Sequence, residues 1–509
     1  MAIVVAQLRG GLGNQLFQYA AVRAIARQAG AQAAIDISLY AGGGPRHFAL
    51  APYDLGLPVL SGSVIAGDSR SVTIPAQAGL ERLGSNGGLK LPLHREDNYE
   101  FEPATKALRN SAYLVGFWQS PKYFSDIADD VRRRFGPAID LNSNAAPAGI
   151  SGDRSVSVHV RRGDYLLDRG LDAPGLCERG YYDAAIGKIR AQVPGAHFFI
   201  FSDDSDWCHQ HFTDPDMTVL STPAVGAGHD LALMASCRHH ILANSSLGWW
   251  GGWLGDRDRS IVIAPIPWFN QAPPAADLIP GHWIRLNRRS GADWSRERVV
   301  IGKEKVSAII LSTGRAELLS RALQSVRKQD HGEIEIVVGL SNPTLAAVAA
   351  VKQCLNDYAG SRLAPSAGAG AALEAAIALA EGAWIAFLDE RDLWLPEKLR
   401  IQLETAYLTG AEVVCCRTMP VAGPQGVPTI FPPPGPCEYP LQQALLAGER
   451  VCGISHTIAR SEIFRKHRLF DGGFTPDEGS DAWMRLLLKQ RAAILWGRYV
   501  ASPIPFVRR

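Results

Sequence analysis

The chain has 509 residues, 47% of them hydrophobic and 20% charged, a length that corresponds to about two to four folded domains. With 52 basic and 50 acidic residues the formal net charge is only +2, which argues against a nucleic-acid-binding surface. The eight cysteines show no CxxC spacing, and no apolar run reaches the roughly 20 residues that a bilayer span needs. We therefore expect reduced thiols and a cytoplasmic protein that can still contact the inner membrane face peripherally.

The first predicted element is a buried strand over residues 2–8, which are apolar and rich in β-branched side chains. A glycine-rich turn, "RGGLGNQ" at residues 9–15, comes next, and apolar residues at helical spacing then predict a helix that ends at Gly30. Strand, glycine turn and helix in this order open a Rossmann-like unit. The glycines do not follow the G-x-G-x-x-G spacing, so a dinucleotide-dependent oxidoreductase is not favoured.

A second series of alternating strands and helices begins near Asp153, after a turn-rich connection at residues 136–153. Its predicted strands are residues 155–160, 197–202, 239–244 and 260–265, with helices at 181–193 and 230–237. The polar residues 287–298 predict a linker, after which a third series begins. Its predicted strands are residues 306–312, 333–340, 383–389 and 411–416, and the proline-rich residues 429–436 are expected to form a loop. The pattern predicts an α/β protein built on parallel sheets.

Three polar clusters stand directly after predicted strands, where ligands bind in open α/β sheets. They are the glycine loop, "HVRRGDY" at residues 159–165 and "NSSLGWWGGWL" at residues 244–254. Ser245 and Ser246 can cap the helix that follows them and leave backbone N–H groups facing an anion. Arg161 and Arg162 can offer forked donors to a phosphate. Together the clusters predict a site for a phosphorylated ligand between two Rossmann-like halves.

Several of these residues also have a structural interpretation that needs no ligand. The glycines would then serve only a tight turn, and Arg162 with Asp164 would form a surface ion pair of small energetic value. For two further groups we favour the structural interpretation. Three tryptophans near the end of the third cluster are expected to pack in the core rather than stack on sugars. One cysteine and two histidines before that cluster are expected to be structural rather than metal ligands. These groups are Trp249, Trp250 and Trp253, and Cys237, His239 and His240.

Five segments resemble, in the same order, the motifs of α-1,2-fucosyltransferases of glycosyltransferase family 11. They are "GGLGNQLFQYA" (10–20), "GFWQSPKYF" (116–124), "HVRRGDY" (159–165), "FSDD" (201–204) and "DLALMASCRHHILANSSLGWWGGWL" (230–254). The resemblance covers roughly residues 1–290 and implies a GT-B fold of two Rossmann-like halves, 1–145 on the acceptor side and 146–290 on the donor side. The implied reaction moves L-fucose from GDP-fucose to a sugar hydroxyl, usually on galactose and here expected to be its O2 in a surface glycan or oligosaccharide, with inversion and without a metal cofactor.

The resemblance also implies roles for individual residues. Arg161 would stabilise the charge that develops on the departing diphosphate, and Arg162 would assist it or pair with Asp164. Donor phosphates would also contact Asn244, Ser245 and Ser246, and the loop at the mouth of the cleft would consist of Gly11, Gly13, Asn14 and Gln15.

Two further assignments keep their alternatives. Asp203 or Asp204 would read the guanine edge, unless the pair only caps a helix. The general base that takes the proton of the acceptor hydroxyl would be His159 or Asp164.

From Val306 onward the chain resembles family 2 glycosyltransferases of the GT-A fold, above all in "GAWIAFLDERDLWLPEKLRIQLE" at residues 382–404. In that family an Asp-x-Asp signature at a strand end binds a divalent cation and the donor diphosphate. Here Asp389 is followed by Arg391, whose guanidinium repels a cation, and Asp392 comes one position late.

Two more family positions differ. Gly339 and Leu340 stand where the family places acids near the base of the nucleotide. Gly479 aligns with the catalytic base, although Glu478 or Asp477 could substitute for it.

We therefore expect residues 305–509 to form a degenerate GT-A-like domain that follows a linker at 291–304 and serves acceptor binding, subunit contact or scaffolding. One alternative is a bifunctional enzyme in which Arg391 supplies the positive charge of the missing metal. Another is a non-catalytic glycan-binding scaffold, against which the intact "HVRRGDY" and "NSSLGWW" clusters count.

Overall fold

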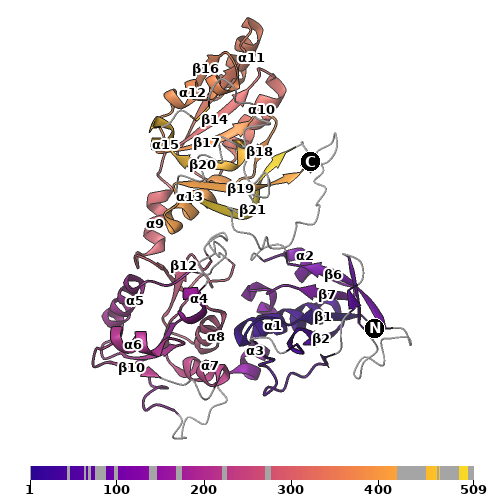
Figure 1. The fold of residues 1–509 in the computed structure, drawn as a ribbon, viewed down its shortest axis with the longest axis vertical. Coiled ribbons are helices and arrows are strands. Elements are labelled where there is room, and N and C mark those ends of the chain that lie inside the picture. The colour runs from indigo at the N-terminus through magenta and orange to yellow at the C-terminus, as the bar shows by residue number, and fades with distance from the viewer. Residues whose placement is uncertain are drawn as a thin grey trace. The chain divides into compact units, whose positions relative to one another are not determined.

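The computed structural model describes residues 2–42, 46–61, 65–66, 70–74, 88–96, 101–136, 146–167, 175–220, 226–269, 277–420, 454–466, 469–470 and 492–502. The chain divides into two compact units. Unit 1 runs from Met1 to Asp293 apart from two short segments, and unit 2 is formed mainly by Trp294–Arg509 (Figure 1). None of the described helices is both long and apolar enough to cross a membrane.

The N-terminal half of unit 1 is built on a seven-stranded sheet in the order β3-β2-β1-β7-β6-β5-β4. The first five strands in this order, β3, β2, β1, β7 and β6, run parallel to one another. The last two pairs, β6 with β5 and β5 with β4, are antiparallel. The strands are β1 (Ile3–Gln7), β2 (Gln32–Asp36), β3 (Val59–Leu60), β4 (Ile65–Ala66), β5 (Ser71–Ile74), β6 (Leu89–Arg95) and β7 (Ala112–Val115). The helices are α1 (Leu12–Ala29), α2 (Pro103–Lys106) and α3 (Ala128–Phe135), with 3-10 turns at Ser38–Tyr40, Pro121–Tyr123 and Ser125–Ile127. The predicted first strand and helix are confirmed, and Gly30 ends α1 in the left-handed conformation that glycine favours.

The C-terminal half of unit 1 has a parallel six-stranded sheet in the order β10-β9-β8-β11-β12-β13. The strands are β8 (Ser155–Val160), β9 (His197–Ser202), β10 (Met217–Leu220), β11 (His239–Ile241), β12 (Val262–Ile266) and β13 (Ile284–Asn287). The helices are α4 (Gly163–Leu167), α5 (Arg179–Gln192), α6 (Ser205–His211), α7 (Ala227–Ser236) and α8 (Ser246–Gly255). The chain starts at the centre with β8, moves outward to β10 and returns to the other side of β8 with β11. The strand order therefore reverses between β8 and β11, and at such a point ligands bind beyond the carboxyl ends of the strands.

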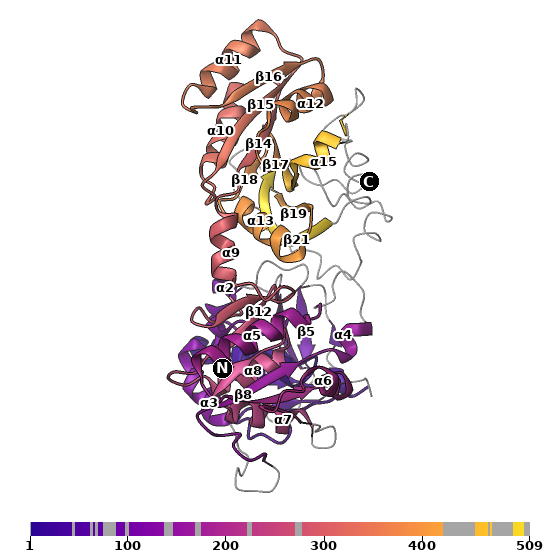
Figure 2. The same ribbon diagram turned by 90° about the vertical axis from the view of Figure 1, so that its left-hand side faces the viewer.

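Unit 2 is built on a mixed eight-stranded sheet in the order β16-β15-β14-β17-β20-β19-β21-β18. Its first four strands are parallel, and β20 is antiparallel to both of its neighbours. The strands are β14 (Val306–Ser312), β15 (Ile334–Ser341), β16 (Arg362–Ser366), β17 (Trp384–Asp389), β18 (Leu393–Trp394), β19 (Val413–Pro420), β20 (Thr457–Arg460) and β21 (Ala492–Ser502). The helices are α9 (Trp294–Ile301), α10 (Ala316–Arg327), α11 (Leu345–Leu355), α12 (Ala369–Leu379), α13 (Lys398–Thr409) and α15 (Ser461–Lys466), with a 3-10 turn at Ile454–His456. Helices α10 and α12 cover opposite faces of the parallel strands (Figures 1 and 2).

Part of the segment predicted as a linker is helix α9, which packs on α13 within unit 2. Trp294 and Ile301 are buried, and the Nε of Arg298 lies 2.8 Å from a carboxylate oxygen of Glu404. The polar composition of this segment predicted its exposed side chains, but it did not predict that these two residues are buried. The predicted loop at 429–436 and half of the predicted connection at 136–153 lie outside the described residues.

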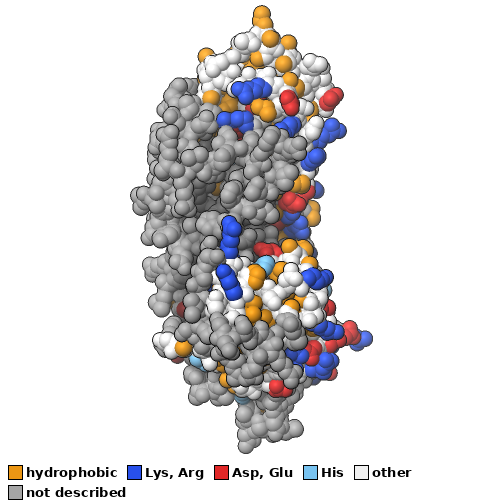
Figure 3. Space-filling view, turned by 90° about the vertical axis from the view of Figure 1, so that its right-hand side faces the viewer, with side chains coloured by type: hydrophobic (Ala, Val, Ile, Leu, Met, Phe, Trp, Pro, Cys, Tyr) orange, Lys and Arg blue, Asp and Glu red, His pale blue; other side chains and the backbone are white. Residues whose placement is uncertain are grey.

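The described surface carries charges of both signs. On the face drawn in Figure 3 basic and acidic side chains are intermingled in the described parts, as the nearly equal numbers of the two kinds predict. Large hydrophobic side chains are exposed at scattered positions, which include Val299 and Val300 of α9 and Leu345 at the start of α11. Isolated apolar side chains of this kind are normal on protein surfaces.

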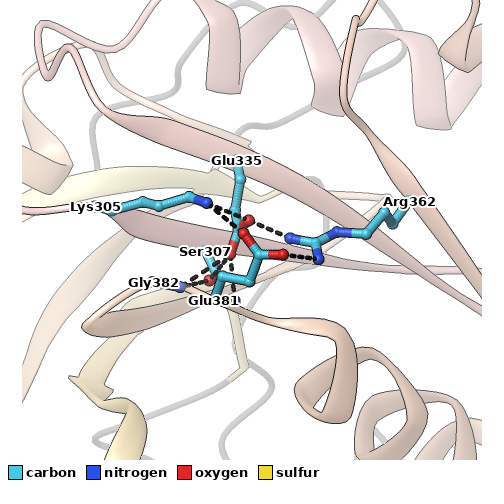
Figure 4. Close-up of polar contacts among 6 residues, drawn as sticks. All are labelled: Lys305, Ser307, Glu335, Arg362, Glu381 and Gly382. Carbon is cyan, nitrogen blue, oxygen red and sulfur yellow. Dashed lines mark hydrogen bonds and ion pairs between the residues drawn. The ribbon is translucent and has the colours of Figure 1, made fainter.

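A network of charged side chains closes the end of the unit 2 sheet where β14, β15 and β17 begin (Figure 4). At its centre is Glu335, whose side chain is only 8% exposed. Its carboxylate accepts hydrogen bonds from two backbone N–H groups and from three side chains. These donors are the N–H groups of Glu381 (2.6 Å) and Gly382 (3.0 Å), Lys305 (3.0 Å), Ser307 and Arg362. Burial by itself raises the pKa of Glu335, but the bonds from Ser307, the two N–H groups and Lys305 outweigh it and lower the pKa to about 2.

Replacing Glu335 by glutamine is expected to lower the free energy of unfolding of unit 2 at pH 7 by about 2 to 3 kcal/mol. Because the folded-state pKa is depressed, this stabilisation is fully present above the ordinary carboxyl value near 4.5 and is lost as the pH falls from there towards 2. Denaturant unfolding at pH 7 and at pH 3 to 4 should show the difference from the wild type shrinking with acid. Glu381→Gln is the matched control and should have a much smaller effect, because the Glu381 side chain is 62% exposed and its ion pairs are screened by solvent. An equal loss at both pH values would contradict the assignment.

Candidate functional site

The candidate site lies beyond the carboxyl ends of β8 and β11, where the strand order reverses. β8 ends at Val160 and leads into Arg161, and β11 ends at Ile241 and leads into helix α8. Because the two strands are parallel neighbours, both connections leave the same edge of the sheet. Tyr165 links them: its hydroxyl donates to the carbonyl oxygen of Asn244 at 3.0 Å, and the Arg161 guanidinium lies 5.6 Å from its ring centre. The second and third predicted clusters are therefore brought together.

The first turn of α8 packs against the glycine loop on one side and against the end of β8 on the other. A Cβ atom on Gly13 would lie 2.4 Å from the carbonyl carbon of Ser246, so only glycine permits this approach of α1 to α8. The indole N–H of Trp250 donates to the carbonyl oxygen of Gly13 at 2.9 Å. A Cβ atom on Gly248 would lie 2.5 Å from Nδ1 of His159. The interpretation of Gly13 as a turn residue is wrong, because Gly13 belongs to α1 and lies where α1 contacts α8, between the two halves of unit 1.

The other glycine-loop residues hold the loop itself. Gly10 has a φ of +77°, which is the turn conformation expected of a glycine. The buried side-chain amide of Gln15 bonds to the main chain at Gly10 (3.0 Å), His47 (2.8 Å) and Ala49 (2.9 Å). Gln15 is therefore a structural residue that ties the segment after residue 45 to the loop. Asn14 accepts a hydrogen bond of 2.9 Å from the amide of Gln119.

Arg46 is a site residue that the sequence analysis did not find. Its Nη2 lies 2.9 Å from Asp164, and its Nη1 would be 3.7 Å from a Cβ atom on Gly11. It therefore reaches from the N-terminal half of unit 1, over the start of α1, to the segment after β8. The only sequence signal was its place within the long loop region that follows β2, and a single arginine there has no recognisable pattern.

Arg161 and Arg162 have different carboxylate partners. Arg161 pairs with Asp164 at 2.8 Å and with Asp203 at 2.9 Å, whereas Arg162 pairs with Asp204 at 3.0 Å. The predicted pair between Arg162 and Asp164 is wrong, because Asp164 pairs with Arg161 and Arg46 instead. Arg161 shares Asp164 with Arg46, so two guanidinium groups from the two halves of unit 1 meet at one carboxylate.

The two acids of "FSDD" are structurally engaged. Asp204 caps α6 by accepting a hydrogen bond of 3.1 Å from the N–H of Trp207, which confirms the capping interpretation for this residue. Asp203 accepts from the N–H groups of Arg162 (2.8 Å) and Gly163 (3.1 Å), in addition to its ion pair with Arg161. Asp203 thus fixes both the backbone after β8 and the orientation of the Arg161 side chain. Recognition of guanine by either acid stays a prediction.

Of the three predicted donor-binding residues at the start of α8, one bonds to neighbouring loops and two have hydroxyl groups that can bind a ligand. The side-chain amide of Asn244 donates to the carbonyl oxygens of Gly175 (2.9 Å) and Trp268 (3.0 Å), so it holds neighbouring loops and is 2% exposed. Ser245 occupies the cap position of α8, but its hydroxyl does not make the capping bond that the sequence predicts. The hydroxyl groups of Ser245 and Ser246 form no hydrogen bond within the described residues. They and the first N–H groups of α8 can therefore bind an anion.

The two candidates for the general base differ in accessibility. His159 is 6% exposed, and its Nδ1 has no hydrogen-bond partner among the described residues. Burial, helped by the positive charge of Arg161, lowers the pKa of His159 to about 4, so its ring is neutral at pH 7. The Asp164 side chain is 48% exposed. Of the two, Asp164 is the group that a hydroxyl from outside can reach.

The two groups interpreted as structural make contacts within the protein. The tryptophans of α8 are buried and pack on aromatic side chains of the N-terminal half: Trp249 and Trp250 lie 4.6 and 5.0 Å from Phe17, and Trp253 lies 5.4 Å from Phe124 between ring centres. The imidazoles near β11 have partners of their own: the ring of His240 bonds to Ser157 at 2.8 Å, and that of His239 accepts from the N–H of Ile261 at 3.0 Å. The thiol of Cys237 is buried and contacts the carbonyl oxygen of Leu233.

In unit 2 the predicted positions lie near the carboxyl ends of β15 and β17. Asp389 forms an ion pair with Arg391 through both of its oxygens, and Asp392 accepts a hydrogen bond from Ser455 at 2.6 Å. Gly339 and Leu340 serve packing: Leu340 is buried, and a Cβ atom on Gly339 would lie 2.7 Å from a carbonyl oxygen of α12. Residues 477–479, with the aligned base position, lie outside the described residues.

Comparison with known proteins identifies the two parts of the chain. Residues 3–285 match glycosyl transferase family 11, and residues 307–466 match glycosyl transferase family 2. The chain is 31% identical to an alpha-1,2-colitosyltransferase of Escherichia coli, over 57% of this chain and all of that protein. It is 27% identical to the O-antigen biosynthesis glycosyltransferase WbnK of Escherichia coli, over 55% and 99% of the two chains. It is 28% identical to galactoside alpha-(1,2)-fucosyltransferase 1 of Mus musculus, over 55% and 71%.

The protein is therefore a glycosyltransferase, which uses a nucleotide-sugar donor and a glycan acceptor. It belongs to glycosyl transferase family 11, and the segment that matches glycosyl transferase family 2 follows in the same chain. The predicted fold class is confirmed: two Rossmann-like halves are followed by a GT-A-like α/β unit.

Proposed function

We propose that unit 1 transfers L-fucose from GDP-fucose to O2 of a galactose residue in a surface glycan or oligosaccharide, with inversion at the anomeric carbon. Support comes from the α-1,2 linkage that the names of its colitosyl and fucosyl relatives share. The structural observation that carries the proposal is that Tyr165 connects Arg161 to Asn244, just before the start of α8, at the point where the strand order reverses.

Charge on the departing diphosphate is the main electrostatic problem of such a transfer. Arg161 is held by Asp164 and Asp203 before any ligand arrives, so its remaining donors need little reorganisation to bind a phosphate oxygen. The hydroxyl groups of Ser245 and Ser246 and the free N–H groups of α8 supply further neutral donors. With these groups in place the leaving group is stabilised without a metal ion, and a chelator should leave the activity unchanged.

The acceptor is proposed to approach from the side of the N-terminal half. Arg46 belongs to that half and contacts Asp164, so Asp164 is in contact with an arginine of each half of unit 1. We assign to Asp164 the proton of the acceptor hydroxyl, because His159 is enclosed by the first turn of α8.

The experiment offers purified full-length protein GDP-fucose with a panel of galactose-terminated oligosaccharides, with and without EDTA, and follows GDP release and product formation. We expect a product whose fucose is attached through an α-1,2 linkage, as determined by NMR. A colitosyl donor with the same nucleotide tests the other sugar that occurs among the relatives. Transfer of colitose alone would contradict the proposed donor. GDP binding without transfer from either donor would favour the scaffold alternative.

A further inference from the structure

The family 2 fold of unit 2 implies a divalent cation at the end of β17, and the side chains there can be tested for their fit to one. Asp389 is the last residue of β17 and occupies the first position of the expected Asp-x-Asp signature. Its Oδ1 accepts from Nε of Arg391 at 2.8 Å and from the N–H of Arg391 at 2.9 Å, and its Oδ2 accepts from Nη2 at 2.9 Å. Both carboxylate oxygens thus face a planar guanidinium, in the forked geometry that arginine and carboxylate groups prefer.

The neighbouring acids are also committed to other partners. Asp392 accepts a hydrogen bond from the hydroxyl of Ser455, and the same Ser455 oxygen accepts from the N–H of Asp389 at 2.9 Å. The Glu390 side chain is buried and accepts from Ser312 and from the hydroxyl (2.6 Å) and the N–H (3.1 Å) of Thr313, at the end of the neighbouring strand β14. The three acids therefore point to three different places. The described residues include no group of three acidic, histidine or cysteine side chains that could hold a metal ion.

The charges explain why this arrangement is stable without an ion. Two carboxylates with a divalent cation sum to zero, and one carboxylate with one guanidinium also sums to zero. An aspartate-to-arginine exchange at the second signature position therefore removes an oxygen ligand and supplies a positive charge in the same step. A hard cation needs several oxygen ligands and would have to displace a guanidinium that already neutralises Asp389.

We infer that Arg391 takes the place of the divalent cation in unit 2, so that this unit holds no metal ion at the end of β17 and does not carry out metal-dependent sugar transfer. The unit is thereby distinguished from unit 1, whose proposed reaction uses other residues. The inference predicts that the cation site is recoverable, because Asp389 is still in position and, among the described residues, its oxygens accept hydrogen bonds only from Arg391.

The test measures Mn²⁺ binding to the full-length protein by EPR. The signal of free Mn²⁺ decreases as the ion binds to the protein. We expect the wild type and Asp389→Asn to give the same titration. In the wild type Arg391 occupies the carboxylate of Asp389, and in the variant that carboxylate is absent. Arg391→Asp should bind about one additional Mn²⁺ per chain, at least ten times more tightly than the wild type. The double variant with Asp389→Asn and Arg391→Asp should lose that site.

Arg315→Asp is the matched control. Arg315 lies exposed at the start of α10, after β14, so the substitution changes the charge at the same edge of the sheet without freeing Asp389. It should add no tight site. A wild-type site that Asp389→Asn removes would overturn the inference. So would a folded Arg391→Asp protein, by circular dichroism, that gains no Mn²⁺. If Arg391→Asp does not fold, Arg391→Asn replaces it, because the asparagine also releases Asp389 and contributes a carbonyl oxygen.

Discussion

Replacing Arg161 by alanine is expected to lower the turnover of glycosyl transfer by about 100- to 1000-fold, the usual effect of removing one preorganised donor from a developing negative charge. The protein should stay folded, because the two acids that Arg161 contacts keep other partners. Asp164 retains Arg46, and Asp203 retains the N–H groups of Arg162 and Gly163. Steady-state kinetics at saturating donor measure the change, and circular dichroism with a thermal melt checks the fold.

Three further variants separate the role of Arg161 from a general effect of charge. Arg161→Lys keeps the charge but loses the forked geometry and should recover only part of the activity. Arg162→Ala should act mainly on stability, because Arg162 pairs with the capping residue Asp204. Arg46→Ala should have an intermediate effect, since half of its side chain is exposed and its pair with Asp164 is partly screened by solvent. Equal turnover in Arg161→Ala and the wild type would remove the electrostatic basis of the proposed reaction.

The second large effect is expected from Gly13→Ala, a change of one methyl group. The added Cβ would lie 2.4 and 2.5 Å from backbone atoms of Ser246 and Leu247, which cannot move away as the end of a flexible side chain can. Helices α1 and α8 must then separate, and the start of α8 shifts from the site. We expect a loss of about 3 kcal/mol in the stability of unit 1, a melting temperature lower by roughly 6 °C and a loss of activity of at least about tenfold.

Gly187→Ala is the control, because it makes the same chemical change with the opposite expectation. Gly187 is an exposed residue within α5, and a Cβ atom there would meet nothing within 4 Å. Alanine favours a helix over glycine by up to about 1 kcal/mol, so this variant should be as stable as the wild type or more stable, with unchanged activity. Calorimetry resolves the transition of unit 1, and the activity assay reports the site. A Gly13→Ala protein that matched Gly187→Ala in both would show that the two helices do not need this contact.

Much of the fold follows from local patterns. The predicted strands at 155–160, 197–202 and 306–312 have the same bounds in the structure. Runs of apolar β-branched and aromatic side chains that are bounded by polar turns favour a buried strand over a helix. Strands β10 and β13 were not predicted, and β11 is shorter than its apolar run. Short edge strands carry little periodic signal, and the burial of residues after β11 comes from packing rather than from the sheet.

The sequence by itself determined the two families, the α/β class and the polar segments that follow the strands, since motif order and strand ends are properties of the chain alone. Even the Asp389–Arg391 pair is within reach of the sequence, because the two residues are only two positions apart. Only the tertiary structure decided which groups meet across the chain: Arg162 with Asp204, Arg46 with Asp164, and Gly13 with the start of α8. The last two contacts depend on how the two halves of unit 1 pack, and the first depends on the pairing of β8 with β9. Side-chain partners distant in sequence leave no local period from which they can be inferred.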